Sequence, residues 1–215
     1  MIHVVTAENR HLYEEELLAH HRIRHDIYIV REKWDDLEVR NGGEYDQFDN
    51  DDAIYLLAIE NDRVVGGSRF IPTIKPHLLS DVFPSLAAPR GIPREPDVFE
   101  WTRFFSVAKR RDPRAGGNGS GPLMCGVFEF LLDEEVRGFT FVCEAWWLKH
   151  TYEWGWKLKP LGFPELHKNQ WLVASYVTVD ADTLSYVRHR YNIAEPVLVR
   201  RGITRPALPR FAATG

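Results

Sequence analysis

The chain has 215 residues, of which 44% are hydrophobic and 27% are charged, and its formal net charge is -4. This balance is typical of a globular protein and excludes disordered and fibrous classes. The small negative charge gives no general attraction for nucleic acid, and no apolar run is long enough to span a membrane, so we expect a cytoplasmic protein that binds neither.

The first half of the chain alternates apolar segments with polar turns. In order, the pattern predicts a strand at Ile2–Val5, a helix from Glu8 to about His25, an irregular loop over Arg31–Asp51, a hairpin of Ala53–Ile59 and Arg63–Pro72, and a strand at Val98–Val107. The helical pattern places Leu12, Tyr13, Leu17 and Leu18 on the inner side of the predicted helix.

The second half continues the alternation of helices and strands. In order, the pattern predicts a helix from Pro122, a strand at Phe139–Glu144, a helix at Leu148–Trp156, a strand at Trp171–Val179, a helix at Asp182–Arg190 and a strand at Pro196–Arg200. We therefore expect one α/β domain over residues 1–215, with helices on both faces of a central, mixed but mainly antiparallel sheet, and a peripheral tail from about residue 202.

The cysteines and histidines form no recognised metal motif. Cys125 and Cys143 lie in apolar segments without the spacing of metal ligands, so we expect both to be reduced. His21 and His25 are one helical turn apart, but no carboxylate or third ligand of known spacing completes a site. We expect neither a metal nor a prosthetic group.

The predicted strand at Val98–Val107 carries charged residues whose directions conflict. Strict alternation puts Arg103 on one face and Glu100 and Thr102 on the other. If Glu100 and Arg103 serve one site, a β-bulge near Thr102 would bring them together, because bulges re-aim side chains beside active sites. The alternative is that Arg103 faces solvent while Glu100 forms a structural ion pair.

Three arginines and three carboxylates stand out in the first half of the chain. Charges among apolar strands cost free energy unless they are paired, so the set indicates either a polar pocket or a network of surface ion pairs. A pocket of both signs would suit a zwitterionic ligand such as S-adenosylmethionine, whose base or cation can stack on Trp34. The charged residues are Arg24, Arg69, Arg103, Asp46, Asp49 and Glu100.

Eight residues resemble, position by position, the signature of LuxI-type acyl-homoserine-lactone synthases, which make quorum-sensing signals. They are Arg24, Trp34, Asp46, Asp49, Arg69, Phe83, Glu100 and Arg103. The match runs from the N-terminus to about Arg111 and departs at Tyr28, where the family usually has Phe. The resemblance implies a GNAT-like three-layer α/β/α sandwich and an acyltransferase whose substrates are S-adenosylmethionine and an acyl thioester.

The resemblance also implies roles for these residues. The S-adenosylmethionine amine attacks the thioester to form an amide, and the carboxylate then closes the lactone and expels methylthioadenosine. We expect Glu100 to act as the base, with Asp46 assisting. The residues expected to bind S-adenosylmethionine are Arg24, Tyr28, Trp34, Asp46, Asp49, Arg69, Phe83 and Arg103.

Two segments are expected to bind the acyl thioester. A glycine-rich run before Pro122 leaves backbone N–H groups free to cradle phosphate, although such runs are as often flexible loops. The aromatic segment from Phe139 to Trp156 would line a small acyl pocket, although any one of its rings is more typical of a core. The expected residues are Phe105, Val107, Arg110, Arg111, Gly116, Gly117, Val142, Cys143, Glu144, Trp146 and Trp147.

The acyl carrier and the acyl group are less constrained by the sequence. Large indoles favour short, branched or aryl acyl groups, and the Trp146-Trp147 segment resembles the family branch that uses acyl-coenzyme A. Acyl carrier protein is less favoured because the chain is net negative. We expect acyl-coenzyme A, with isovaleryl as the first choice. Two other functions stay open: a GNAT-type N-acyltransferase acting on another amine, and a non-catalytic S-adenosylmethionine sensor.

Overall fold

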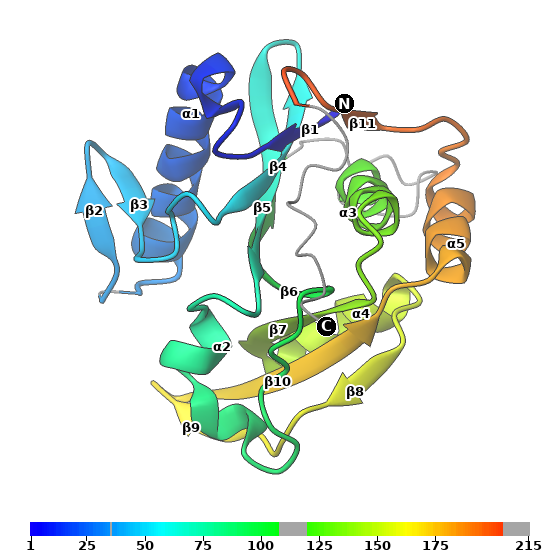
Figure 1. Ribbon diagram of the computed structural model, residues 1–215. Coiled ribbons are helices and arrows are strands. Elements are labelled where there is room, and N and C mark those ends of the chain that lie inside the picture. The colour runs from blue at the N-terminus through cyan, green and yellow to red at the C-terminus, as the bar shows by residue number, and fades with distance from the viewer. Residues whose placement is uncertain (35, 108–119, 204–215) are drawn as a thin grey trace, which may run out of the picture.

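The structure is a computed structural model that describes residues 1–34, 36–107 and 120–203. Within these residues nine strands form one sheet (Figure 1). Across the sheet they run β11 (Leu198–Val199), β1 (Ile2–Val5), β4 (Ile54–Glu60), β5 (Arg63–Pro72), β6 (Val98–Ser106), β7 (Gly138–Glu144), β10 (Gln170–Thr178) and β8 (Leu158–Pro160), and β9 (Glu165–His167) also pairs with β10. The β1–β11 and β6–β7 pairs are parallel and the others antiparallel, which confirms the mixed, mainly antiparallel sheet.

Helices lie on both faces of this sheet, as predicted. On one face lies α1 (Glu14–Arg24), and on the other lie α3 (Gly121–Asp133) and α5 (Ala181–Tyr191) (Figure 1). Strand alternation sends neighbouring residues to opposite faces. Leu56 packs in the core cluster that contains the apolar side chains of α3, whereas Leu57 packs in a separate cluster on the α1 side.

The first helix begins later than predicted. A 3-10 turn at Arg10–Leu12 precedes α1, because the side chain of Asn9 accepts a hydrogen bond from the backbone N–H of Thr6 and donates to the carbonyls of Val4 and Arg201. These bonds fold the segment back before the helix starts. The prediction that Leu18 faces inward is wrong, since 42% of its surface is exposed.

The region predicted as an irregular loop contains a short hairpin of β2 (Glu38–Arg40) and β3 (Gly43–Tyr45) beside α1. A Cβ atom at Gly43 would lie 2.8 Å from Cβ of His21, so glycine permits this close approach. A strand of three residues is too short to be recognised from the alternation of apolar and polar residues. The remaining helical elements are a π-helix at His25–Arg31, α2 (Leu78–Asp81), 3-10 turns at Pro84–Ala87 and Ala145–Trp147, and α4 (Leu148–Glu153).

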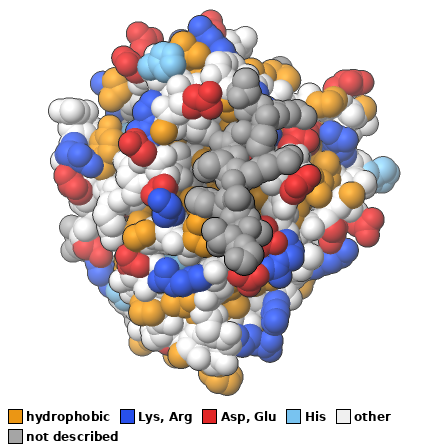
Figure 2. Space-filling view, in the orientation of Figure 1, with side chains coloured by type: hydrophobic (Ala, Val, Ile, Leu, Met, Phe, Trp, Pro, Cys, Tyr) orange, Lys and Arg blue, Asp and Glu red, His pale blue; other side chains and the backbone are white. Residues whose placement is uncertain are grey.

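The surface in the view of Figure 2 carries acidic and basic side chains interspersed with one another. In the described part of the chain no helix has both the length and the apolar character needed to cross a membrane.

Candidate active site

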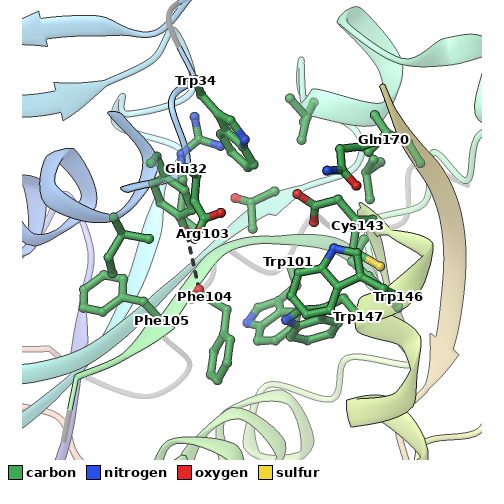
Figure 3. Close-up of a pocket in the computed structure, with 18 of the residues that line it drawn as sticks. Glu32, Trp34, Trp101, Arg103, Phe104, Phe105, Cys143, Trp146, Trp147 and Gln170 are labelled. Atoms are coloured by element: carbon green, nitrogen blue, oxygen red, sulfur yellow. Dashed lines mark hydrogen bonds between the residues drawn. The ribbon is translucent and has the colours of Figure 1, made fainter. Parts of the chain in front are cut away.

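A cavity of about 610 Å³ lies where β6 and β7 separate (Figure 3). The two strands pair in parallel from Val98 with Gly138 to Glu100 with Thr140. Residues beyond these pairs line the cavity from both strands. Ten residues predicted to bind the two substrates lie in its wall: Tyr28, Trp34, Phe83, Arg103, Phe105, Val142, Cys143, Glu144, Trp146 and Trp147.

The bulge predicted near Thr102 is present on β6. Thr102 pairs with Arg69 and Phe105 pairs with Gly67, so one residue of β5 faces two residues of β6. Arg103 is the first of these two and has a φ of 54°, in the left-handed region. The bulge turns Arg103 toward the same side as Thr102, which accepts a hydrogen bond from Arg69. The alternative of a solvent-facing Arg103 is wrong, since only 7% of its side chain is exposed.

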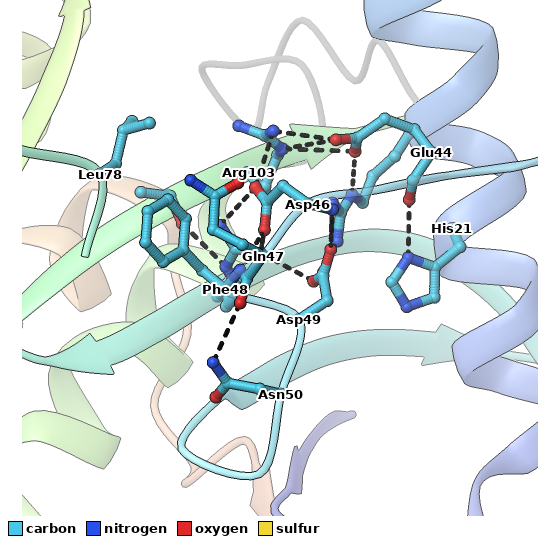
Figure 4. A network of polar contacts seen from close by, with 12 residues as sticks. His21, Glu44, Asp46, Gln47, Phe48, Asp49, Asn50, Leu78 and Arg103 are labelled. Atoms are coloured by element: carbon cyan, nitrogen blue, oxygen red, sulfur yellow. Dashed lines mark hydrogen bonds and ion pairs between the residues drawn. The ribbon is translucent and has the colours of Figure 1, made fainter. Parts of the chain in front are cut away.

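Arg103 belongs to a network of three arginines and three carboxylates (Figure 4). Arg24 binds Asp49 with both Nη atoms, at 2.7 and 2.8 Å, and Arg69 binds Asp46 in the same way, at 2.6 and 2.9 Å. A further bond of 2.7 Å joins Arg69 to Asp49. The equal number of opposite charges allows the network to stay ionised although it is buried.

Glu44 is the third carboxylate of the network, and the sequence reasoning missed it. Its carboxylate accepts from Nε of Arg24 at 2.5 Å and from Nη2 of Arg103 at 2.8 Å. Glu100, which was expected in this place, lies elsewhere. The available signal was the position of Glu44 two residues before Asp46, in the same charged run.

The electrostatics of the network keep its carboxylates ionised. Burial alone would raise the pKa of Asp49, but Arg69 and Arg24 hold it well below its usual range. Burial likewise opposes ionisation of Asp46 and Glu44, and Arg103 helps to lower the pKa of both. These groups are acceptors for hydrogen bonds and not proton donors at neutral pH.

Arg103 is the arginine of this network that reaches the cavity. Its Nε and Nη2 atoms face Glu44, and Nη2 also lies 2.8 Å from Asp46. Its Nη1 atom has no hydrogen-bond partner in the described part of the chain. Arg24 and Arg69 have no exposed surface and lie behind it. Within the described residues the network therefore holds Nε and Nη2 of the Arg103 guanidinium and leaves Nη1 for a ligand.

Two aromatic residues stand beside Arg103. Tyr28, in the π-helix, stacks on Trp34 with ring centroids 5.0 Å apart, and the Arg103 guanidinium lies 5.4 Å from the Tyr28 ring. The Tyr28 hydroxyl donates to the carbonyl of Phe104 at 3.2 Å. The hydroxyl that distinguishes Tyr28 from Phe thus fastens the π-helix to the bulge, and both rings stay in the cavity wall.

Glu100 lies outside the cavity wall. It has no exposed surface, and its two carboxylate oxygens accept hydrogen bonds from the backbone N–H groups of Leu78 and Leu79 at 2.7 and 2.6 Å. Burial raises its pKa to about 7, against the lowering effect of these two bonds. Leu78 lines the cavity, so Glu100 sits directly behind that wall.

Indole rings form the wall opposite the ion network. Trp147 packs against Trp101, Trp154 and Trp156, with ring centroids 5.5 to 6.5 Å apart. Trp146 is different, because 56% of its surface is exposed. Figure 3 shows Trp101, Trp146 and Trp147 gathered on one side of the cavity. Sequence reasoning missed Trp101 as a wall residue, since its place in a strand gave no sign that the neighbouring strand departs.

Some predicted residues are not in this wall. Val107 is described, is 42% exposed and does not line the cavity. Arg110, Arg111, Gly116 and Gly117 lie outside the described residues. Among the residues that are described, no three His, Cys, Asp or Glu side chains are grouped so that they could hold a metal ion. Both cysteines are free thiols, Cys125 in the core and Cys143 in the cavity wall.

Comparison with known proteins gives a consistent result. Residues 8–187 match the family model described as autoinducer synthase. The chain is 43% identical over 201 residues to the isovaleryl-homoserine lactone synthase of Bradyrhizobium diazoefficiens, covering 94% of this chain and 89% of the relative.

Solved structures agree in fold. The coenzyme A-dependent acyl-homoserine lactone synthase BjaI, solved with S-adenosylmethionine and isopentyl-coenzyme A, superposes with a TM-score of 0.88 at 42% identity, covering 95% of this chain and 94% of that one. A putative N-acetyltransferase from Lactobacillus plantarum has a TM-score of 0.52 at 13% identity, covering 83% of this chain and 99% of that one. This distant likeness bears on the fold alone and confirms its GNAT-like character.

Proposed function

This chain belongs to the autoinducer synthase family, and we propose that it makes its acyl-homoserine lactone from S-adenosylmethionine and a short branched acyl-coenzyme A. The chain is an acyltransferase of the acyl-homoserine-lactone synthase type. Isovaleryl is the proposed acyl group, supported by the named product of the 43% identical relative.

The reaction has two bond-forming steps. The S-adenosylmethionine amine attacks the thioester carbonyl, a C–N bond forms, and the C–S bond to coenzyme A breaks. The carboxylate oxygen then attacks the carbon next to the sulfonium, which closes the lactone and releases methylthioadenosine. Both steps depend on holding the reacting atoms in line, so positioning by the protein supplies much of the rate.

The substrate carboxylate is proposed to bind Arg103. This residue lines the cavity and its Nη1 atom has no partner among the described residues, while Nε and Nη2 are held by Glu44 and Asp46. Arginine binds carboxylates strongly because both groups are planar and ionised. In this proposal Arg24, Arg69 and Asp49 act behind Arg103 and keep its guanidinium in place.

The rest of S-adenosylmethionine is proposed to lie along Tyr28, Trp34 and Phe83. The stacked rings of Tyr28 and Trp34 offer a flat surface for the adenine, and their negative faces attract the sulfonium. Phe83 contributes to the same wall. Arg103, held by the buried ion network, and the aromatic surface of Tyr28 and Trp34 line one cavity and match the carboxylate and the adenine of this substrate.

The ammonium group of S-adenosylmethionine has to lose a proton before it can attack. We assign this first proton to Glu100, with the negative charge of Asp46 assisting. The pKa of Glu100, about 7, suits a base at neutral pH. Because Glu100 has no exposed surface, a water molecule has to carry the proton to it.

The acyl thioester is proposed to enter between β6 and β7. The strands part after Glu100 and Thr140, and the indole wall of Trp101, Trp147 and Trp154 closes this part of the cavity to long chains. A small apolar acyl group fits such a wall. The net charge of -4 disfavours an acidic carrier protein, which supports coenzyme A as the carrier.

The observation that carries this proposal is that Nη1 of Arg103, unpartnered among the described residues, lies in a cavity that also has an aromatic wall. The test is to incubate the protein with S-adenosylmethionine and a panel of acyl-coenzyme A and acyl-carrier thioesters. Isovaleryl-homoserine lactone and methylthioadenosine should appear in equal amounts by mass spectrometry. Acylation of another amine without methylthioadenosine would instead identify a general N-acyltransferase.

A further inference from the structure

Among the described residues, four carboxylate side chains line the cavity outside the ion network: Glu32, Asp36, Glu144 and Glu153. Three of them have partners, because Glu32 binds Arg31 at 2.7 Å, Asp36 binds Lys168 at 3.0 Å and Glu153 binds His150 at 3.2 Å. Glu144 is half-buried and has no hydrogen-bond or ion-pair partner in the described part of the chain. A carboxylate left unpaired in a cavity wall is available to a ligand.

Glu144 stands across the cavity from Arg103. It is the last residue of β7 and pairs with Leu172 of β10, beyond the point where β7 leaves β6. Arg103 lies on β6, the other strand of the divergent pair. Figure 3 places Arg103 and Cys143, the residue before Glu144, on opposite sides of the cavity. A substrate that bridges the two strands therefore meets a guanidinium on one side and a carboxylate on the other.

The proposed substrate matches this arrangement. In an α-amino acid the amine is separated from the carboxylate carbon by a single atom. With the carboxylate on Arg103, the amine lies inside the cavity, where the thioester carbonyl that enters between β6 and β7 has to reach it. The group needed there is an acceptor for an amine N–H.

We infer that Glu144 contacts the attacking amine and accepts its second proton as the C–N bond forms. This inference rests on the proposed function and extends it, since Glu100 is assigned the first proton of the ammonium. We assign the contact with the amine to Glu144 because the carboxylates of Glu100, Asp46 and Asp49 are already bound by backbone amides or arginines.

The proton balance is complete without a further reagent. The neutral amine attacks the carbonyl carbon, and the nitrogen becomes positively charged and acidic. Glu144 takes one proton from this nitrogen, the C–S bond breaks, and the thiolate of coenzyme A receives the proton from Glu144. The products are an amide and a free thiol, and the Glu144 carboxylate is regenerated.

The test compares Glu144→Gln with Glu100→Gln between pH 6 and 9.5, measuring thiol release from isovaleryl-coenzyme A. Glutamine keeps the size of the side chain but cannot accept a proton. For Glu144→Gln we expect the rate to fall about 10²- to 10⁴-fold at every pH, the usual effect of losing a general base. The loss in Glu100→Gln should shrink at high pH, because solvent then removes the first proton.

A second variant separates chemistry from misfolding. Glu144→Ala leaves space for a small carboxylate, so added formate should restore part of its rate. Glu60→Gln, an exposed change at the end of β4, serves as the matched control and should keep the rate of the unaltered protein. Thermal unfolding of each variant checks that the fold is intact.

Three outcomes would overturn the inference: a Glu144→Gln rate within threefold of the unaltered protein, a deficit that disappears at high pH, or no rescue of Glu144→Ala by formate. Failure of the unaltered protein to form lactone would instead contradict the proposed function. The two failures are therefore distinguishable.

Discussion

Glu44 joins Arg103 to Arg24, with one carboxylate oxygen 2.8 Å from Nη2 of Arg103 and the other 2.5 Å from Nε of Arg24. None of the Glu44 surface is exposed. The left-handed conformation of Arg103 costs about 1–3 kcal/mol at a non-glycine residue and persists only where the surroundings enforce it. The contacts with Glu44 hold Arg103 in this conformation, so the direction of the Arg103 side chain depends on a residue outside the cavity wall.

Replacing Glu44 by Gln should destabilise the fold strongly. The change leaves three buried arginines with two carboxylates, and breaking a buried ion pair in this way typically costs about 3–5 kcal/mol. Urea unfolding measures the loss. The control is Glu38→Gln, because Glu38 forms an exposed pair with Arg40 at 2.9 Å, and such pairs contribute about 0–1 kcal/mol. Equal losses in both variants would contradict the role given to Glu44.

Replacing Arg103 by Lys should weaken binding of S-adenosylmethionine. Lysine keeps the positive charge but has no second edge, so it cannot hold Glu44 and Asp46 while it binds a carboxylate. A lost hydrogen bond between charged groups is worth about 1.5–3 kcal/mol, which predicts an affinity about 10- to 150-fold lower. Titration calorimetry measures this value.

The Arg103→Lys test has two internal checks. Affinity for acyl-coenzyme A should change little, since Arg103 is assigned to the substrate carboxylate and the acyl group to the indole wall. Arg63→Lys, at an exposed position that begins β5, should leave both affinities as they are. An unchanged affinity for S-adenosylmethionine in Arg103→Lys would remove Arg103 from the carboxylate site.

The bulge on β6 shows which features of the candidate site could be predicted from the sequence. Regular alternation separates Glu100 from Arg103, and only the requirement that both serve one site led to a bulge near Thr102. The structure confirms the bulge, but it turns Arg103 toward Glu44 and Asp46 while Glu100 binds the amides of Leu78 and Leu79. The bulge on β6 can thus be anticipated when two residues of that strand are required to serve one site. The hydrogen-bond partners of Glu100 cannot be anticipated, because they depend on where α2 packs.

The cavity wall was predictable only in part. The aromatic segment after Phe139 pointed to Trp146 and Trp147, and both line the cavity. Their different exposure depends on the 3-10 turn at Ala145–Trp147, which alternation and helical periodicity do not reveal. Trp101 was missed because the parting of β6 and β7 is a property of tertiary packing and leaves no mark in the composition of either strand.

The raised pKa of Glu100 predicts a pH dependence of stability. Its pKa is about 7 in the folded protein against an ordinary value of 4.5, so folding favours the protonated form. The stability contributed by this proton is complete below about pH 4.5 and is lost as pH rises through 7, a change on the order of 3 kcal/mol. Glu100→Gln cannot titrate at this position. As pH rises through this range, the unfolding free energy of Glu100→Gln should therefore increase relative to that of the unaltered protein.

Urea unfolding at several values between pH 4.5 and 8 measures the effect of Glu100. Glu60→Gln is the control, since an exposed glutamate should give a constant difference from the unaltered protein. A constant difference for Glu100→Gln as well would mean that its carboxyl group titrates normally in the folded state.

The two adjacent tryptophans should differ in their effect on acyl selectivity. Trp147 packs among Trp101, Trp154 and Trp156, so Trp147→Ala should open space in the acyl wall and admit longer chains. Trp146 is 56% exposed and its ring contacts only His150 and Lys149 among the described residues, so Trp146→Ala removes less buried ring surface and serves as the matched control. The measurement is kcat/KM for a series of acyl-coenzyme A thioesters from four to ten carbons.

The shift in Trp147→Ala should be graded with chain length. One methylene in an apolar pocket changes discrimination by about 1–3 kcal/mol, so the preference should move by roughly 10- to 200-fold between neighbouring chain lengths and not switch absolutely. Trp146→Ala should change the profile less than about threefold, which is under 1 kcal/mol. If Trp147→Ala keeps the original profile, or if the unaltered protein prefers long straight chains on acyl carrier protein, the indole wall does not set the acyl group, and Trp147 is ordinary core.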